Sequence, residues 1–453
     1  MQSRGHVANK RITRREFIKT TAAGAVAAGM APTILVPARS HAAGARKTLK
    51  MIQWVHFVPA FDRWFNDIYI KQWGEKNNTE VLVDNIGVAG LSTRAAAEVS
   101  ARRGHDLFLF NWPPPAYEEQ AVDMSDVYAE CEKKFGKPID LAVKSTYNPK
   151  TKKYFGFSPS FTPDPINWRK DLWDDVGVVP DSWDKILGGG RKIRQKHNIP
   201  VGIGLAQELD TAMAVRTIMY AFGAHEQDAN GNLALNSKNT IEAVKFVKAL
   251  FHETMTPEVF TWDPSSNNRA MLAGTISVAL NAISITRQGE KDNPAFTQKI
   301  HLAKAAAGPV RRIGLEHVMD VYVIWKFAEN IEGAKKFLVD YVTNFREAFL
   351  HGEFYDFPCF ERTVPDLQQL IAKDAKGQPA DKYKVLADVL SWATNVGYPG
   401  YANAAIDEIY QKWILNVMFA KAAQGVLTPE NAVKEAEAEC KRIWDKWRQR
   451  KLL

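Results

Sequence analysis

Short hydrophobic runs alternate with longer amphipathic stretches through most of the chain. The runs 49–55, 80–86 and 107–110 are rich in β-branched and aromatic residues and have the length of strands. Between them, the apolar positions of 61–77 and 92–103 recur with helical spacing. This order predicts a βαβαβ unit, in which parallel strands are joined by right-handed crossovers.

Residues 157–165 interrupt the pattern with three prolines. Proline cannot continue a central strand or a helix interior, so we expect the chain to cross here into a second domain. Residues 167–173 are expected to start a helix after this crossing. Strands are predicted at 276–280 and 318–325. Helices are predicted in the segments 184–197, 210–222, 240–254 and most of 402–450, where Thr428 and Pro429 open the last helix through a cap and a proline in its first turn.

The length of 453 residues exceeds one ordinary domain, and the alternation of elements indicates an α/β fold. Hydrophobic residues make up 46% of the chain and charged residues 24%, which is typical of a soluble globular protein and excludes a disordered or multi-span membrane protein. Three cysteines, Cys131, Cys359 and Cys440, allow at most one disulfide.

The formal net charge of +8 is concentrated at the start of the chain. Residues 1–42 contain seven lysines and arginines and one glutamate, so they carry most of that charge. The rest of the chain is close to neutral and has no electrostatic reason to bind nucleic acid.

The first 42 residues resemble a twin-arginine signal peptide. Arg14 and Arg15 precede Phe17 and a stretch of small and apolar residues, and small residues place a cleavage site after Ala42. A membrane anchor is the alternative, but the stretch is short for a span of ~20 residues. We therefore expect export through the twin-arginine machinery, cleavage and a location in the periplasm.

Five segments resemble family 1 of the extracellular solute-binding proteins, the sugar-type receptors of ABC importers. Each is weak alone, but their order and spacing behind an export signal make the resemblance strong from about Leu49 to Trp447. The segments are 165–173 (PINWRKDLW), 177–184 (GVVPDSWD), 267–278 (NNRAMLAGTISV), 333–338 (GAKKFL) and 427–432 (LTPENA).

The resemblance implies a periplasmic-binding-protein-like fold, with two α/β lobes joined by hinge strands and a ligand cleft between them. It assigns 43–158 with 282–322 to the N-terminal lobe, and 159–281 with 323–453 to the C-terminal lobe. The lobes would close on a small solute, and the closed form would deliver it to an ABC permease of two membrane subunits with an ATPase. We expect a monomer that binds no cofactor and no metal.

Two other classes of protein stay open, a secreted carbohydrate-active enzyme and a solute receptor for a sensor kinase. The enzyme motifs are incomplete. Residues 156–160 lack the second glycine of a nucleophile elbow, and 252–256 lack the second histidine of a zinc-protease helix. Residues 228–232 lack the glycine of a calcium loop and favour a β-turn. We expect no catalytic residues.

The candidate ligand-binding residues lie on loops that are expected to line the ligand cleft. In open α/β sheets ligands bind at the carboxyl ends of strands, and sugars need aromatic platforms and polar hydrogen-bonding side chains. Burial in the core is an equally good explanation for the presence of Trp54 at its position. Helix capping is the alternative role for Asp164, Glu208 and Asp210. The Trp262–Asp263 pair is a weaker candidate. The predicted set is Trp54, His56, Asn111, Trp112, Phe161, Asp164, Asn281, Ser284, Tyr355 and Tyr398.

Two features in these loops are unusual for a malto-oligosaccharide receptor. His56 follows the first strand, and three consecutive prolines at 113–115 follow the third. A charged or modified carbohydrate, a polyol or a glycerophosphodiester therefore stays open as the solute.

Overall fold

The computed structural model describes residues 46–453, which form one compact unit. The predicted signal peptide, with Arg14, Arg15 and the cleavage site after Ala42, lies outside the described residues. Within the described part, no helix has the length and apolar character needed to span a membrane. The strands are β1 (Lys47–Trp54), β2 (Thr79–Ile86), β3 (Leu107–Phe110), β4 (Tyr147–Asn148), β5 (Lys153–Tyr154), β6 (Phe157–Thr162), β7 (Ile166–Arg169), β8 (Val278–Leu280), β9 (Ile300–Ala303), β10 (Gly314–Leu315), β11 (Val318–Ile324), β12 (Phe357–Pro358) and β13 (Ala393–Thr394).

The helices surround these strands and include most of the predicted ones. A π-helical turn over Phe65–Tyr69 joins the first two. The α-helices are α2 (Pro59–Trp64), α3 (Ile70–Lys76), α4 (Leu91–Ala101), α5 (Ser125–Phe135), α6 (Asp140–Thr146), α7 (Lys170–Asp175), α8 (Trp183–His197), α9 (Leu209–Ala221), α10 (Lys238–Thr254), α11 (Ser266–Leu272), α12 (Ser284–Asp292), α13 (Pro294–Thr297), α14 (Ile331–Thr343), α15 (Phe345–His351), α16 (Leu367–Ala372), α17 (Ala404–Gln411), α18 (Ile414–Ala423) and α19 (Pro429–Gln449).

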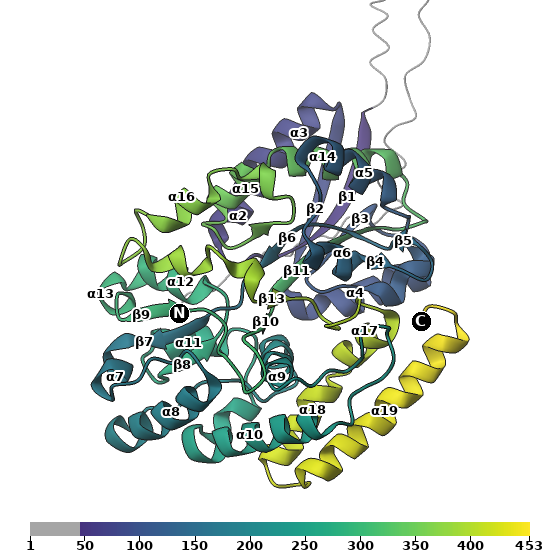
Figure 1. Ribbon diagram of the computed structural model, residues 1–453. Helices are drawn as coiled ribbons and strands as arrows, with labels where there is room; N and C mark the ends of the chain where they lie inside the picture. The colour runs from purple at the N-terminus through teal and green to yellow at the C-terminus, as the bar shows by residue number, and fades with distance from the viewer. Residues whose placement is uncertain (1–45) are drawn as a thin grey trace, which may run out of the picture. The chain divides into compact units, whose positions relative to one another are not determined.

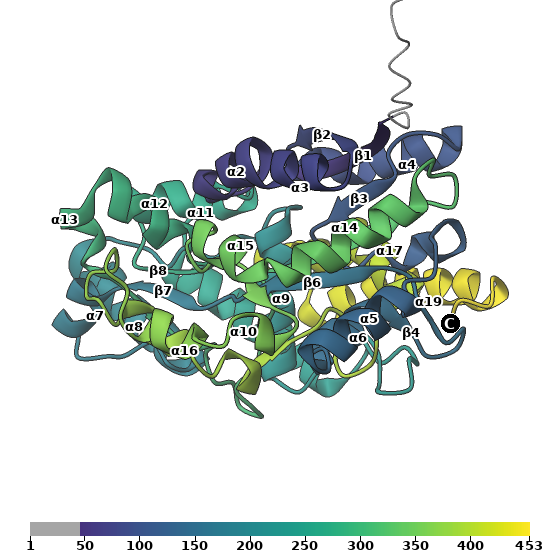
Figure 2. The ribbon, with the colours of Figure 1, turned by 90° about the horizontal axis from the view of Figure 1, so that it is seen from above.

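A six-stranded sheet is built in the order β12-β6-β11-β3-β1-β2. Strand β1 pairs in parallel with β2 and β3, which confirms the predicted parallel strands of the βαβαβ unit. Strand β11 returns from far along the chain and pairs antiparallel with β3 and β6. Every residue of β3, β6 and β11 is buried, because helices and neighbouring strands cover both faces. In Figure 2, α14 lies beside β6 and α5.

A separate antiparallel sheet has the order β8-β7-β9. Figure 1 shows it in the lower half of the view with α7, α8 and α10, while the six-stranded sheet lies in the upper half. The chain crosses from β6 to β7 through residues 163–165, within the predicted crossing. The prediction of a helix from Asn167 is wrong. Asn167 and Trp168 pair with strands on both sides, and the helix begins only at Lys170.

The division into two lobes stays a prediction, because residues 46–453 group as one unit. The strand pairings add detail to it. Strand β9, from the range 282–322, pairs with β7 in the three-stranded sheet. Helix α14, from the range 323–453, packs on β6 and β11 of the six-stranded sheet. Strands β10 and β13 form a third, two-stranded sheet where the chain returns between these two regions.

The C-terminal helices pack on one another as the apolar periodicity predicts. Helix α19 contacts α18, α17 and α10, and it buries Trp444 and Trp447. The Thr428 hydroxyl accepts a hydrogen bond from the Asn431 amide, which confirms the predicted cap. Ser182 caps α8 in the same way. The three cysteines are buried and free of disulfides.

Candidate functional site

The ends of several strands meet at one edge of the six-stranded sheet. Because β1 and β3 are parallel and β11 is antiparallel to β3 and β6, the carboxyl ends of β1, β3 and β6 lie at the same edge as the start of β11. This edge carries the loops that begin after Trp54, Phe110 and Thr162 and the segment that ends at His317. Four of the ten predicted ligand-binding residues lie on these loops: His56, Asn111, Trp112 and Asp164.

Trp54, His56 and Tyr355 lie together, although Tyr355 is distant in sequence. The rings of Trp54 and His56 stack with centroids 4.7 Å apart, and the Tyr355 ring meets His56 edge-on at 4.9 Å. The Val58 amide donates to His56 Nδ1 at 2.8 Å, so Nε2 carries the proton and donates to Asp356 Oδ2 at 2.9 Å. This pairing holds the imidazole in one orientation.

Asp320 is a buried acid in the middle of an otherwise apolar strand. Its carboxylate accepts hydrogen bonds from Trp54 Nε1 at 3.1 Å and from Ser160 Oγ at 2.9 Å. Burial, together with the negative charge of Asp356, raises the pKa of Asp320 to about 7. This residue was not among those predicted from the sequence. A lone acid inside the run VMDVYVI was the available signal.

Asp164 and Asp210 lie on either side of His317. Asp164 Oδ1 is 3.1 Å from His317 Nδ1, and Asp210 Oδ1 is 4.0 Å from His317 Nε2. All three side chains are buried. Burial raises the pKa of Asp210 to about 6, although the positive charge of His317 opposes this rise.

A chain of hydrogen bonds joins Asn281 and Ser284 to Asp210. Asn281 Nδ2 donates to Asn267 Oδ1 at 2.8 Å and to Asn268 Oδ1 at 2.5 Å. Asn268 Nδ2 donates to Ser284 Oγ at 3.1 Å, and Asn267 Nδ2 donates to Asp210 Oδ2 at 2.5 Å. We call the following ten side chains the buried polar cluster: His56, Asp164, Asp210, Asn267, Asn268, Asn281, Ser284, His317, Asp320 and Asp356.

Tyr355 connects the two parts of this cluster. Its pKa is raised well above the ordinary value by burial and then by the charges of Asp356, Asp210, Asp320 and Asp164. The side chain therefore lies within electrostatic reach of acids from both parts. Its hydroxyl has no hydrogen-bond partner among the described residues.

Other buried polar atoms in this region also have no partner among residues 46–453. They include both amide atoms of Asn111, Oδ1 of Asn281 and Oε2 of Glu316. An unpaired buried polar group costs about 1–3 kcal/mol, so such groups are rare without a functional reason. Asn111 follows β3 and Glu316 precedes β11, so these two lie at the strand ends where a ligand is expected.

Beside the cluster lies a cavity of about 280 Å³, which we call the aromatic cavity. Four of its lining side chains are aromatic, Trp112, Trp262, Tyr410 and Trp413. Within the described chain its only charged lining residues are Glu208 and Asp263. The remaining lining residues are neutral: Val88, Ala89, Ser92, Gln207, Leu209, Pro264 and Gln411.

The surrounding structure holds the residues of this cavity in place. Trp112 Nε1 donates to Asp407 Oδ1 at 3.2 Å, and the Ala116 amide donates to Asp407 Oδ2 at 3.0 Å. The Glu208 carboxylate caps α9 by accepting from the amides of Asp210 and Thr211 at 2.7 and 2.6 Å. Burial, and then the charge of Asp210, raises the pKa of Glu208 to about 8. The cap predicted for Glu208 is confirmed.

The cavity and the cluster are connected through neighbouring residues. Glu208 lines the cavity, and Asp210, two residues later, belongs to the cluster. Asn111, with its unpaired amide, immediately precedes Trp112. Tyr410 and Trp413 come from the C-terminal helical region and were not predicted from the sequence.

Phe161 and Tyr398 lie elsewhere. Phe161 packs against Phe357 with ring centroids 6.0 Å apart, because side chains alternate along β6 and its neighbours Ser160 and Thr162 face the cluster. Tyr398 accepts a hydrogen bond from Arg311 and lies against the rings of Tyr220 and His225. Neither residue lines the aromatic cavity or bonds to the cluster.

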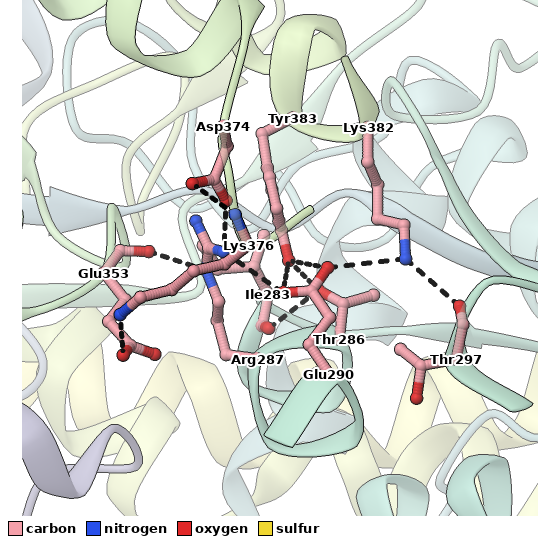
Figure 3. Close-up of polar contacts among 10 residues, drawn as sticks. All are labelled: Ile283, Thr286, Arg287, Glu290, Thr297, Glu353, Asp374, Lys376, Lys382 and Tyr383. Atoms are coloured by element: carbon pink, nitrogen blue, oxygen red, sulfur yellow. Dashed lines mark hydrogen bonds and ion pairs between the residues drawn. The ribbon is translucent and has the colours of Figure 1, made fainter. Parts of the chain in front are cut away.

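A buried ionic network (Figure 3) supports the turn that directly precedes Tyr355 and Asp356. Arg287 of α12 donates from Nε to the carbonyl oxygen of Glu353 at 2.8 Å and from Nη1 to Asp374 Oδ2 at 2.5 Å. Its guanidinium lies 3.8 Å from the centre of the Tyr383 ring. Glu353 and Phe354 both have a positive φ, of 53° and 68°, so this turn is strained and needs such support.

Within residues 46–453, no group of three or more His, Cys, Asp or Glu side chains is placed to hold a metal ion. The arrangement suits the binding of a solute by stacking and by hydrogen bonds.

The fold and this site define the class of periplasmic binding proteins. The model of the family described as "Bacterial extracellular solute-binding protein" matches residues 59–344, which is more than half of the chain. The chain belongs to this family. The predicted family and fold class are thereby confirmed. No curated protein sequence matches the chain.

Solved structures with the same fold cover nearly all of the described residues. Maltose-bound MalE3 of T. maritima is 18% identical, with a TM-score of 0.72 over 87% of this chain and 99% of that one. A solute-binding protein of Agrobacterium radiobacter K84 in complex with ribitol is 19% identical, with a TM-score of 0.71 over 88% and 98%. A sugar transporter protein of Arthrobacter chlorophenolicus A6 with bound laminaribiose is 15% identical, with a TM-score of 0.73 over 87% and 99%.

Proposed function

We propose that this protein is the solute-binding component of an ABC importer and that it binds a carbohydrate or carbohydrate-like solute. The observation that carries the proposal is the aromatic cavity beside buried polar atoms that have no partner. Sugars and polyols combine apolar faces with hydroxyl groups, so they need this combination. The related folds bound to maltose, ribitol and laminaribiose support the solute class.

The solute would lie between the two sheet regions. Trp112 would offer a ring face, while Asn111, Asn281 and Tyr355 would bond to hydroxyl groups. The proposed motion is a hinge closure about the segments that cross between the sheets, among them 163–165. Closure would be driven by tighter binding of solute to the closed form than to the open form.

The proposal includes delivery of the solute to a permease of two membrane subunits with an ATPase, by a monomeric receptor in the periplasm. Export would depend on the twin-arginine signal with Arg14 and Arg15.

A thermal-shift screen of the purified protein against sugars, polyols and amino acids tests the solute class. Solute at 100 times its dissociation constant adds ~2.7 kcal/mol to the free energy of unfolding, which gives a measurable shift. We expect a sugar or polyol to shift the melting temperature and to be recovered unchanged by mass spectrometry. Recovery of a cleaved product would instead identify an enzyme, and a shift only with amino acids would overturn the carbohydrate class.

The site is tested by Trp262→Ala, because this side chain is only partly buried and its removal should leave the fold intact. We expect the dissociation constant to rise about tenfold, equivalent to about 1.4 kcal/mol of binding free energy. The matched control is Leu390→Ala, an exposed apolar residue outside the aromatic cavity. Equal binding by both variants would contradict the assignment of the cavity.

A further inference from the structure

The aromatic cavity has the charge pattern of a site for a cation. Its charged lining residues, in the part of the chain that the structure describes, are Glu208 and Asp263. Two arginines lie near it, but each is already paired. Arg269 contacts Asp263 at 2.8 Å, and Arg216, 4.7 Å from the Tyr410 ring centre, is buried against Glu226 at 2.6 Å.

Aromatic rings around a carboxylate attract positive charge. The faces of tryptophan and tyrosine rings carry negative electrostatic potential, and sets of such rings recognise ammonium groups. Burial disfavours the charged form of the Glu208 carboxyl group. A cation beside it would restore the charged form of Glu208 by direct attraction.

Two buried acceptors of the adjoining region have no donor among the described residues, Glu316 Oε2 and Asn281 Oδ1. An ammonium group supplies up to three donors, so it could bond to such acceptors.

The backbone of Trp413, which lines the cavity, is strained. It has a φ of 57° and a ψ of 29°, a left-handed conformation that a tryptophan rarely adopts. Such strain persists only where the surroundings hold it, and it clusters at ligand sites. Here it occurs at the break between α17 and α18, at a residue that lines the cavity.

We infer that the solute carries a cationic nitrogen, as an ammonium or quaternary ammonium group, which sits among Trp112, Trp262, Tyr410 and Trp413 beside Glu208. The inference rests on the proposed function and names its solute class as an amino sugar or amino polyol. A neutral sugar would stack on the rings but form no ion pair with Glu208. An anionic solute would meet two carboxylates and no free cation.

Titration calorimetry with matched pairs tests this inference on the purified full chain. The probes are glucosamine with glucose and N-acetylglucosamine, and 1-amino-1-deoxyglucitol with glucitol, with glucuronate as the anion. We expect the cationic member of at least one pair to bind about tenfold or more tightly than its neutral partner, with no binding of glucuronate.

The outcomes separate the inference from the function on which it rests. If a neutral member binds as tightly as its cationic partner or more tightly, the charge inference falls and the receptor function stands. If none of the probes binds, the carbohydrate-like solute class falls, and the inference falls with it.

Variants of the lining residues test whether the preference for a cationic solute arises at the aromatic cavity. Glu208→Gln keeps an oxygen to cap α9 and removes the negative charge, so we expect the ratio of cationic to neutral affinity to fall about fivefold or more. Trp262→Leu, at a partly buried position, should lower the same ratio if Glu208→Gln does not fold. The control is Asp366→Asn, which loses a partly exposed acid paired with Arg346, outside the cavity. An unchanged ratio in Glu208→Gln and Trp262→Leu would overturn the inference.

Discussion

Arg287 Nε donates a 2.8 Å hydrogen bond to the carbonyl oxygen of Glu353, two residues before Tyr355. The two residues belong to distant parts of the chain, since Arg287 lies on α12 and Glu353 follows α15. A buried cation thus holds a left-handed turn in place through the carbonyl group of Glu353 (Figure 3). That turn directly precedes Tyr355 and Asp356 of the candidate site.

Loss of the Arg287 charge should destabilise the protein strongly. In Arg287→Gln the carboxylates of Asp374 and Glu290 lose their buried partner, and removal of one member of a buried pair costs about 3–5 kcal/mol. Urea unfolding measures this loss. Arg346→Gln, which breaks an exposed pair with Asp366, should change the free energy of unfolding by only about 0–1 kcal/mol. Similar losses in the two variants would show that the buried network does not support the fold.

Tyr355→Phe should separate binding from stability. The variant removes a buried hydroxyl that has no partner in the described chain, so the free energy of unfolding should stay the same or rise by about 1 kcal/mol. Solute binding, measured by calorimetry, should weaken about tenfold, because the hydroxyl is proposed to bond to the solute.

The matched control is Tyr383→Phe. Its hydroxyl bonds to Thr286 and Glu290 at 2.9 Å, so its loss should cost about 1–3 kcal/mol of stability while solute affinity stays unchanged. The opposite pattern, in which Tyr355→Phe loses stability and keeps its affinity, would remove Tyr355 from the site.

The free energy of unfolding should fall as the pH rises from about 4 to 8. The folded pKa of Asp320 is raised from 3.8 to about 7 and that of Glu208 from 4.5 to about 8, so the folded state binds protons more tightly than the unfolded state. Each group therefore contributes stability that is present below its unfolded pKa and lost as the pH rises through its folded pKa. The slope approaches about 1.4 kcal/mol per pH unit for each group.

Urea unfolding at several pH values tests this, with the wild-type protein and Asp320→Asn compared. The variant should show a shallower slope between about pH 4 and 7, the interval in which Asp320 titrates. Asp356 and His56 also face this carboxylate, and they are unchanged in the variant. Identical slopes for the two proteins would contradict a raised pKa at Asp320.

Export should depend on the paired arginines. Replacement of both Arg14 and Arg15 by lysine keeps the charge but removes the arginine pair, so the protein should stay in the cytoplasm at its precursor length. Cell fractionation with immunoblotting measures this. Arg39→Lys, outside the pair, should be exported and cleaved as usual, and normal export of the double variant would show that another route is used.

Local features of the fold were predictable because neighbouring residues decide them. The parallel pairing of β1 with β3 follows from the order of short apolar runs and an intervening helix, and the caps at Ser182 and Thr428 follow from a side chain and the amides next to it. The loops after Trp54 and Phe110 lie at one edge of the sheet, where the candidate site is, because parallel strands end at the same edge.

The content of the site was decided by contacts between distant segments. Asn167 is in a strand because β8 and β9 lie on both sides of it, which outweighed the helical pattern that follows. Asp320 faces the site only because β11 pairs antiparallel with β6 and brings its carboxylate to Ser160. Phe161, one position further along β6, faces the other way and packs on Phe357.

The sequence by itself therefore determined the class of fold, the family and the edge of the sheet where the loops gather, because periodicity, caps and turn residues act over a few positions. Only the tertiary structure brought Tyr410 and Trp413 from the C-terminal helices to Trp112, and Asp210 to His317. Burial then raised the pKa values of acids that look ordinary in the sequence, since desolvation depends on all the surrounding atoms.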